Sequence, residues 1–130
     1  MTLEQPIAQG ETILVVEDDK NIRRVVARFL SGLGYTVLEA GDGKTALALL
    51  EGAPEIELLL SDVVLPGGLS GPDIVAAARC QRADLKSLFM SGHIAKGTSN
   101  PVRLPEDIGL LRKPFTKHDL AQRVRAVLDE

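Results

Sequence analysis

Reactive side chains follow directly after several apolar runs of this sequence. They are Asp62 within LLLSDVVLP (58–66), Glu17 and Asp18 after TILVV (12–16), Ser91 at the end of KSLFMS (86–91), and Lys113 after IGLLR (108–112). A carboxylate among Leu and Val residues loses hydration unless a charged partner compensates for it. Three carboxylates, a hydroxyl and an ammonium could together place a phosphoryl group on an aspartate, which is a known covalent form of catalysis.

The chemistry of these groups also predicts a metal ion. Carboxylates that lie close together raise one another's pKa unless a cation separates them. Oxygen ligands without His or Cys suit Mg²⁺ or Mn²⁺, and such an ion keeps waters and coordinates phosphate. The ammonium of Lys113 would add a further point charge for phosphate. We therefore predict an aspartate nucleophile, Asp62, inside an electrostatic cradle for a phosphoryl group.

Two hydrophobic periodicities alternate along the chain and would bring these residues together. Strands are predicted at 12–17, 35–40, 56–61, 86–91 and 108–112, and amphipathic helices separate most of them. The continuous apolar runs at 12–17 and 56–61 are typical of strands covered on both faces. Asp19 and Asp42 are expected to cap helices, and Thr116 with Asp119 approximates a capping box. Such alternation predicts a parallel sheet, and ligands collect beyond the carboxyl ends of its strands.

Two segments depart from the alternation. Residues 1–11 are polar and contain Pro6 and Gly10, so we expect a flexible N-terminal lead-in before a single domain at 12–130. The segment 93–107 contains a glycine and two prolines and has few apolar residues, so the helix expected there should be short, distorted or missing.

Composition narrows the class of protein. The 130 residues are 45% hydrophobic and 25% charged, with 15 Lys and Arg against 18 Asp and Glu. The net charge of −3 argues against direct nucleic-acid binding. The longest apolar runs are too short for membrane insertion, and no signal peptide is evident. The single cysteine, Cys80, suits a reducing cytoplasm and is interpreted as a small core residue of the third helix.

Four short motifs follow one another along the chain: ILVVEDD, SDVVLPGG, MSG and KPF. In this combination they resemble the receiver domain of two-component response regulators, over about residues 12–129. The resemblance implies a flavodoxin-like (βα)5 three-layer α/β sandwich with a parallel sheet of order 2-1-3-4-5. GETILVVEDD, LPGGLSGPD and LLRKPFT look more like receivers of hybrid sensor histidine kinases than like those of DNA-binding regulators. As no output domain follows residue 130, a stand-alone or an excised receiver is expected.

The resemblance also implies roles for single residues. Asp62 would accept the phosphoryl group from a phosphohistidine of a histidine kinase or of a histidine phosphotransfer protein. Glu17 and Asp18 would bind Mg²⁺ together with Asp62 and the backbone carbonyl of Val64.

Two further groups would contact the phosphoryl group itself. Ser91 would hydrogen-bond one phosphoryl oxygen and act as the movable switch. Lys113, preceding a cis Pro114, would contact another. Such a domain is a phosphorelay module that switches a protein–protein surface, not a metabolic enzyme. Its output would go to a downstream protein target or a fused kinase core.

Three features depart from the usual receiver pattern. The loop after Asp62 is one residue longer, which would alter the start of the next helix. The position of the switch aromatic, three residues before Lys113, is Leu110, so an aromatic switch cannot work here in the usual way. The weak segment 93–107 would disturb the face that most receivers use for output.

Three other functions compete with this reading. A phosphatase of the haloacid-dehalogenase type needs an acid two residues after its nucleophile, where this chain has Val64. A nucleotide carrier should offer Gly, Ser and Thr amides in its first loop, where EDDKN offers negative charge. A degenerate receiver that only scaffolds partners is the third. Leu110 keeps this alternative open, but the intact set of Glu17, Asp18, Asp62, Ser91 and Lys113 weighs against it. Outside the site, His93 is expected to pack at the surface or rim, and Arg123 and Arg125 to form a solvated face.

Overall fold

One parallel sheet organises the chain, whose computed structural model describes residues 6–92, 105 and 107–130. Its elements are β1 (Thr12–Val16), α1 (Lys20–Gly32), β2 (Thr36–Ala40), α2 (Gly43–Gly52), β3 (Ile56–Asp62), α3 (Gly71–Gln81), β4 (Lys86–Ser91), β5 (Gly109–Arg112) and α4 (Lys117–Leu128). Among the described residues the strands pair in the order β2-β1-β3-β4-β5, all parallel, which confirms the predicted flavodoxin-like topology. The helix predicted within 93–107 falls almost wholly outside the described residues.

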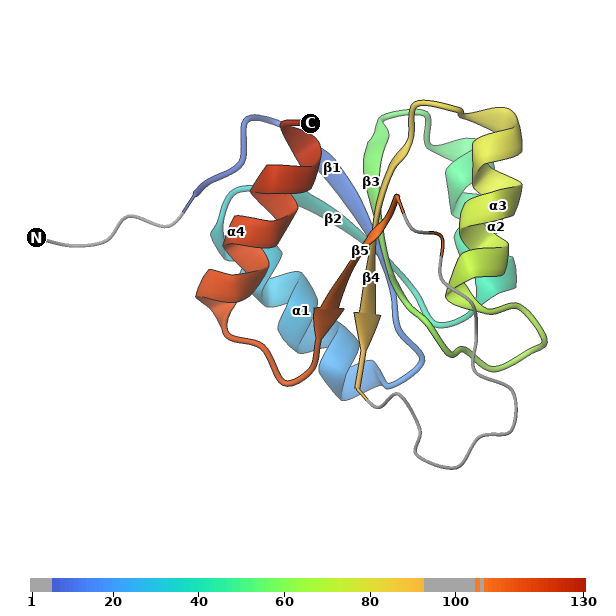
Figure 1. Cartoon of the computed structure of the whole chain (residues 1–130), viewed down its shortest axis with the longest axis horizontal. Helices are drawn as coiled ribbons and strands as arrows, with labels where there is room; N and C mark the ends of the chain where they lie inside the picture. The colour runs from blue at the N-terminus through green and yellow to red at the C-terminus, as the bar shows by residue number, and fades with distance from the viewer. Residues whose placement is uncertain (1–5, 93–104, 106) are drawn as a thin grey trace, which may run out of the picture.

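The sheet separates two hydrophobic cores because side chains alternate across each strand. In β1, Leu14 and Val16 belong to the core under α2 and α3, whereas Ile13 and Val15 belong to the core under α1 and α4. All of these side chains are fully buried. Figure 1 shows the resulting layers, with α1 and α4 on one face of the sheet and α2 and α3 on the other. The continuous apolar run of β1 therefore predicted correctly that this strand is covered on both faces.

Helices α1, α2 and α4 begin at the caps that the sequence predicted. Asp19 accepts hydrogen bonds from the backbone N–H groups of Asn21 and Ile22, and Asp42 accepts one from Thr45. Thr116 and Asp119 form a reciprocal capping box at the start of α4. These bonds satisfy backbone donors that have no partner within a helix.

Two predicted environments are wrong. Cys80 is exposed, because the buried face of α3 consists of Ile74, Val75 and Ala78 and leaves position 80 pointing to solvent. Arg125 is not part of a solvated face, because the side chain is only 12% exposed and contacts the segment that leads into β1. Arg123, by contrast, is exposed as predicted.

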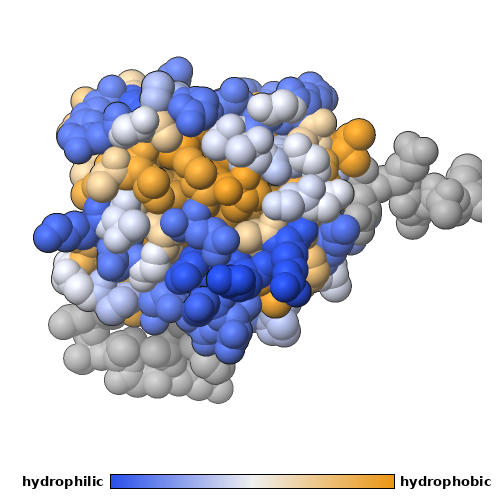
Figure 2. Space-filling view, turned by 180° about the vertical axis from the view of Figure 1, so that it is seen from behind, coloured by the Kyte–Doolittle hydropathy of each residue, from blue (hydrophilic) through white to orange (hydrophobic). Residues whose placement is uncertain are grey.

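The β2 side of the molecule carries an apolar band. Figure 2 views the molecule from behind the orientation of Figure 1 and shows hydrophobic side chains running between hydrophilic margins. Val37 and Leu38 of the edge strand β2 are only half-buried, and each packs against one of the two cores.

Within the described parts of the chain, no helix is long and apolar enough to cross a bilayer.

Arg125 ties the segment before β1 to α4. The guanidinium donates to Glu11 Oε2 at 2.6 Å, to Asp129 Oδ1 at 2.8 Å and to the Ile7 carbonyl at 3.4 Å. The backbone N–H of Ala8 also donates to the Leu33 carbonyl at 2.9 Å. The hydrogen bond from Arg125 holds the pKa of the buried Glu11 carboxyl below its usual 4.5. The described part of the lead-in therefore contacts the domain, while the domain limit at residue 12 stays a prediction.

Glu11→Gln is expected to lower the free energy of unfolding by about 2 kcal/mol at neutral pH, since it removes a charged acceptor from Arg125. Because the folded pKa of Glu11 is lowered, its contribution is complete above pH 4.5 and disappears as the pH falls through the folded pKa. The free energies of unfolding of parent and variant, measured with urea, should therefore become equal in acid. Glu55→Gln, at an exposed loop residue, is the control; a gap between parent and Glu11→Gln that persists in acid would contradict this account.

Candidate functional site

The strand register brings the predicted site residues to one edge of the sheet. Val16, the last residue of β1, pairs with Ser61, and the next residue of β3, Asp62, pairs with Met90. Ser91, at the end of β4, pairs with Arg112 of β5. Because all strands are parallel, Glu17, Asp62, Ser91 and Lys113 follow or end their strands at the same carboxyl edge.

Three carboxylates form a cluster at this edge. Glu17, Asp18 and Asp62 each offer an oxygen that lies within 4.8 Å of the other two. Glu17 is buried, Asp62 is half-buried and Asp18 is exposed, so the cluster opens to solvent on the Asp18 side. An all-oxygen donor set of this size fits Mg²⁺ or Mn²⁺ and leaves room for water or phosphate oxygens.

Lys113 bridges the cluster from β5. Its Nζ lies 2.5 Å from Glu17 Oε2 and 3.4 Å from Asp62 Oδ2, and the side chain is only 15% exposed. Its backbone N–H donates to the Ser91 carbonyl at 2.8 Å, which places Ser91 directly beside it. The Lys113–Pro114 peptide bond is cis, as the sequence resemblance implied.

The charges at this edge shift one another's protonation. Burial raises the pKa of Glu17, and the negative charge of Asp62 adds to this, although the hydrogen bond from Lys113 opposes it. Burial by itself would lower the pKa of Lys113, but the Glu17 hydrogen bond and the two carboxylate charges outweigh it, so the pKa is raised. Lys113 is therefore a charged ammonium at neutral pH, and an added cation beside Glu17 would oppose the upward shift of its pKa.

Backbone contacts fix the Asp62 side chain and main chain. Asp62 Oδ1 accepts the backbone N–H of Val63 at 2.9 Å, and Ser61 Oγ donates to the Asp62 carbonyl at 2.9 Å. Gly71 lies against the same carbonyl, because a Cβ there would come within 2.3 Å of the Asp62 oxygen. Sequence reasoning missed Gly71, and the only local signal was its place directly before the helix-starting Pro72.

The loop after Asp62 turns through two glycines. Gly67 and Gly68 both have positive φ, at 86° and 87°, which L side chains rarely adopt. Ser70 then caps α3 and completes a capping box with Asp73. The side chain of Val64 is 64% exposed in this loop. The role of its carbonyl as a metal ligand stays a prediction.

An apolar hollow adjoins the cluster. It measures about 340 Å³ and is lined on the α1 side by Ile22, Val25 and Phe29 and on the other side by Pro114 and Phe115, with Lys113 shared between hollow and cluster. Ile22 and Val25 are 38% and 47% exposed. Their helical spacing predicts an apolar face of α1, but these two residues lie near its N-terminal end, where neither sheet nor helix covers them.

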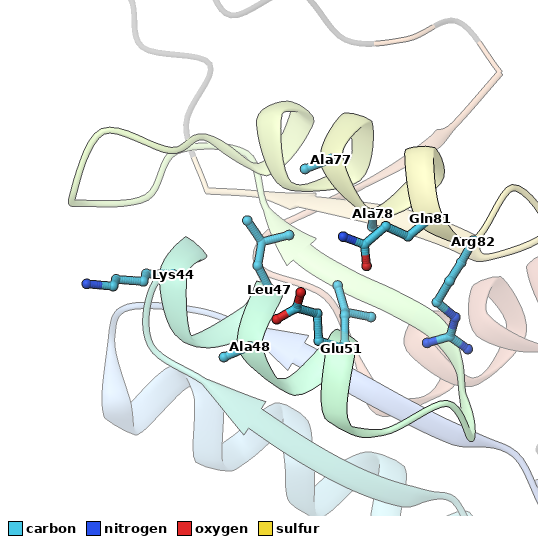
Figure 3. Close-up of a pocket in the computed structure, with 9 residues that line it drawn as sticks. Lys44, Leu47, Ala48, Glu51, Ala77, Ala78, Gln81 and Arg82 are labelled. Atoms are coloured by element: carbon cyan, nitrogen blue, oxygen red, sulfur yellow. The ribbon is translucent and has the colours of Figure 1, made fainter.

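A second groove lies away from the carboxylates. It measures about 350 Å³ and runs between α2 and α3, with Lys44 near one end and Arg82 near the other (Figure 3). The Arg82 guanidinium is occupied in holding the turn into β3, since it donates to the carbonyls of Ala53, Pro54 and Ile56. The groove shares no residue with the acidic cluster.

Comparison with known proteins identifies the family of the chain. A family model for the response regulator receiver domain matches residues 13–125. Sensor kinase CckA of Brucella abortus (strain 2308) is 34% identical over 125 residues, which make up 95% of this chain and 13% of that kinase. The response regulator receiver protein CpdR of the same organism is 33% identical over 116 residues, which make up 89% of this chain and 95% of CpdR.

A solved structure of a receiver domain is also similar to this chain. The crystal structure of the receiver domain from the hybrid histidine kinase CckA matches with a TM-score of 0.75 and 38% identity, covering 90% of this chain and 98% of that domain. The likeness to the sensor kinase concerns a small part of its length, whereas CpdR is matched almost from end to end. The chain belongs to the response regulator receiver domains, the signalling modules of two-component systems.

Proposed function

We propose that Asp62 accepts a phosphoryl group from a phosphohistidine, with Mg²⁺ or Mn²⁺ held by Glu17, Asp18, Asp62 and the Val64 carbonyl. The observation that carries the proposal is the meeting of three carboxylates with one half-buried ammonium at the carboxyl edge of the sheet. A bound divalent ion would neutralise charge on the phosphoryl oxygens. The chain's own residues supply the nucleophile, its orientation and a second positive charge.

The transfer needs no general base, because an ionised carboxylate is itself the nucleophile. Asp62 Oδ2 forms the new O–P bond while the N–P bond of phosphohistidine breaks. The electron pair of the broken N–P bond returns to the imidazole nitrogen of the donor. The Val63 N–H holds the other oxygen, Oδ1, at 2.9 Å and so fixes the orientation of the carboxylate. The product is an aspartyl phosphate, which is ready to lose its phosphoryl group to water.

Lys113 and Ser91 are the groups proposed to receive the phosphoryl oxygens. The Lys113 ammonium already lies 3.4 Å from Asp62 Oδ2, the atom that would carry phosphorus. Ser91 follows Met90, the residue that pairs with Asp62, so it lies on the neighbouring strand beside the phosphoacceptor position. Movement of Ser91 toward a phosphoryl oxygen would couple modification of Asp62 to the end of β4.

A protein is the phosphoryl donor that the surroundings of the site favour. The apolar hollow beside Lys113 is lined by Ile22 and Val25, which are both partly exposed to solvent. Exposed apolar residues next to a reactive group favour docking of a protein surface over capture of a small anion. A histidine kinase or a histidine phosphotransfer protein is the partner class proposed. The signal would pass to a downstream protein target or a fused kinase core.

Phosphoramidate tests the proposal, because its P–N bond mimics that of phosphohistidine. With Mg²⁺ present, intact-protein mass spectrometry should find one added phosphoryl group, and chelation of the metal should prevent it. Transfer should also occur from a phosphorylated histidine phosphotransfer protein, and that protein should lose its phosphoryl group. Absence of any adduct with Mg²⁺ and fresh donor would favour a domain that only scaffolds partners.

Asp18→Asn is expected to weaken Mg²⁺ binding at least about tenfold, since loss of a ligand charge should exceed the effect of an outer-shell change. Amide chemical shifts of the 15N-labelled chain, followed against Mg²⁺ concentration, measure the affinity. Asp19→Asn is the matched control, because it removes a charge from the same loop and keeps a side chain that caps α1. Equal affinities for parent and Asp18→Asn would refute the role of Asp18.

A further inference from the structure

Arg23 of α1 reaches back to the loop that carries the acidic cluster. Its Nη1 donates to the Glu17 carbonyl at 2.9 Å, and its Nε donates to Glu39 Oε1 of β2 at 3.2 Å. The side chain is 18% exposed, so the guanidinium is largely enclosed between α1, the end of β1 and β2. One planar group therefore joins the backbone of a predicted metal ligand to a carboxylate on the neighbouring strand.

The Glu17 peptide is held from both of its polar ends. Its N–H donates to the Ala40 carbonyl of β2 at 3.1 Å, and its carbonyl accepts from Arg23. Gly41 leaves the space that the guanidinium needs, since a Cβ there would lie 3.2 Å from Arg23 Nη1. Both contacts lead to β2, so the edge strand fixes the turn from which the side chains of Glu17 and Asp18 project.

We propose that Arg23 is a positioning residue for the acidic cluster and sets its affinity for Mg²⁺ through the backbone of Glu17. This inference rests on the proposed function of the cluster. Arg23 is not placed among the carboxylate oxygens, and its charge is paired with Glu39. Its effect is to restrict the Glu17–Asp18 turn so that the carboxylates converge before an ion arrives.

Charge and positioning predict opposite results when Arg23 is changed. A cation near the cluster repels Mg²⁺, so an effect of charge alone would make Arg23→Gln bind the ion more tightly. Loss of positioning would make the same variant bind more weakly, by about tenfold. Lysine keeps the charge but lacks the planar fork that reaches a carbonyl and a carboxylate together. Arg23→Lys should therefore behave like Arg23→Gln if geometry is what matters.

The test is a Mg²⁺ titration of the full chain followed by amide chemical shifts of residues 17, 18 and 63. Arg23→Gln and Arg23→Lys should both weaken binding about tenfold, while Arg24→Gln, at the neighbouring exposed arginine, should match the parent. Parent-like affinity in Arg23→Lys, tighter binding in Arg23→Gln, or equal values for Arg23→Gln and Arg24→Gln would overturn the inference.

Two further measurements keep the result interpretable. If Arg23→Gln does not fold, Glu39→Gln retains the arginine and removes its anchor together with one negative charge, so its Mg²⁺ titration is run at high KCl concentration, where charge effects on an exposed group are screened. Weaker Mg²⁺ binding than the parent under these conditions supports the inference, and equal binding overturns it. A parent chain that does not bind Mg²⁺ at all would overturn the proposed function together with the role of Arg23. A parent that binds Mg²⁺, with Arg23 variants that bind it equally well, would overturn only the role of Arg23.

Discussion

Asp62→Asn is expected to abolish the phosphoryl adduct formed with phosphoramidate and Mg²⁺. The amide that replaces the carboxylate is a poor nucleophile, and no other carboxylate in the cluster has the same placement. Glu17 is buried and its Oε2 lies 2.5 Å from Lys113, whereas Asp18 is exposed at the rim. Glu17 makes the same two kinds of contact, because its Oε1 accepts the Asp19 N–H at 3.2 Å, but its side chain is only 2% exposed. Asp62 is half-buried, with Oδ1 held by the Val63 N–H and Oδ2 3.4 Å from the ammonium. Intact-protein mass spectrometry at matched protein and donor concentrations measures the loss.

The position of the adduct can be established independently of the variant. Borohydride reduces an aspartyl phosphate to homoserine, so a peptide map of the phosphorylated parent should place homoserine at position 62. Asp73→Asn is the control, because Asp73 is an exposed carboxylate of the α3 capping box. That variant should gain the adduct as the parent does. An adduct of equal yield on Asp62→Asn would show that another residue is the acceptor, and the phosphoacceptor role of Asp62 would have to be given up.

The convergence of the site residues could be predicted from local patterns and one rule of topology. Apolar runs mark β1, β3, β4 and β5, and parallel strands put their carboxyl ends at one edge. The sequence alone therefore predicts that Glu17, Asp62, Ser91 and Lys113 share one edge of the sheet, and the strand registers agree. The caps at Asp19 and Asp42 depend only on residues within the first helical turn, which is why they were predictable as well.

Contacts between distant segments were not predictable in this way. The pairing of Arg125 with Glu11 joins residues more than a hundred positions apart, and the Arg23 bridge depends on how β2 lies beside β1. The need for glycine at position 71 arises from the approach of α3 to the Asp62 carbonyl. Cys80 has a side chain small and apolar enough for either environment, so its type alone could not place it on the exposed side of α3.

Leu110 marks the limit of the resemblance. It pairs with Phe89 across β4 and β5 and is half-buried against the core under α2 and α3. A leucine has no aromatic ring to swing, so a signal that started from a modified Asp62 would have to use other movements. That the usual aromatic switch is absent stays a prediction, and it concerns how the signal leaves the domain rather than how Asp62 is modified.

Lys113→Ala is expected to slow phosphorylation of Asp62 about 10²-fold at saturating Mg²⁺ and donor, the size of effect seen when one preorganised electrostatic contact is removed. The ammonium is largely enclosed and fixed by Glu17, so it acts on developing phosphoryl charge without first having to reorient. Its raised pKa keeps it charged at neutral pH. The rate of adduct formation, measured by quenched-flow mass spectrometry, is the readout. Lys44→Ala removes the same charge outside the cluster and should keep the parent rate.

Lys113→Ala should bind Mg²⁺ as tightly as the parent or more tightly. A loss of transfer rate without a loss of Mg²⁺ affinity would identify the role of Lys113. In the resting domain the ammonium occupies the oxygens of Glu17 and Asp62 that a metal ion would share. Its removal takes away a competing cation but also the second positive charge that faces the phosphoryl group. A slower transfer with undiminished metal affinity therefore places Lys113 in phosphoryl stabilisation. If Mg²⁺ affinity and transfer rate fell together and excess Mg²⁺ restored the rate, Lys113 would instead be a residue that organises the metal site.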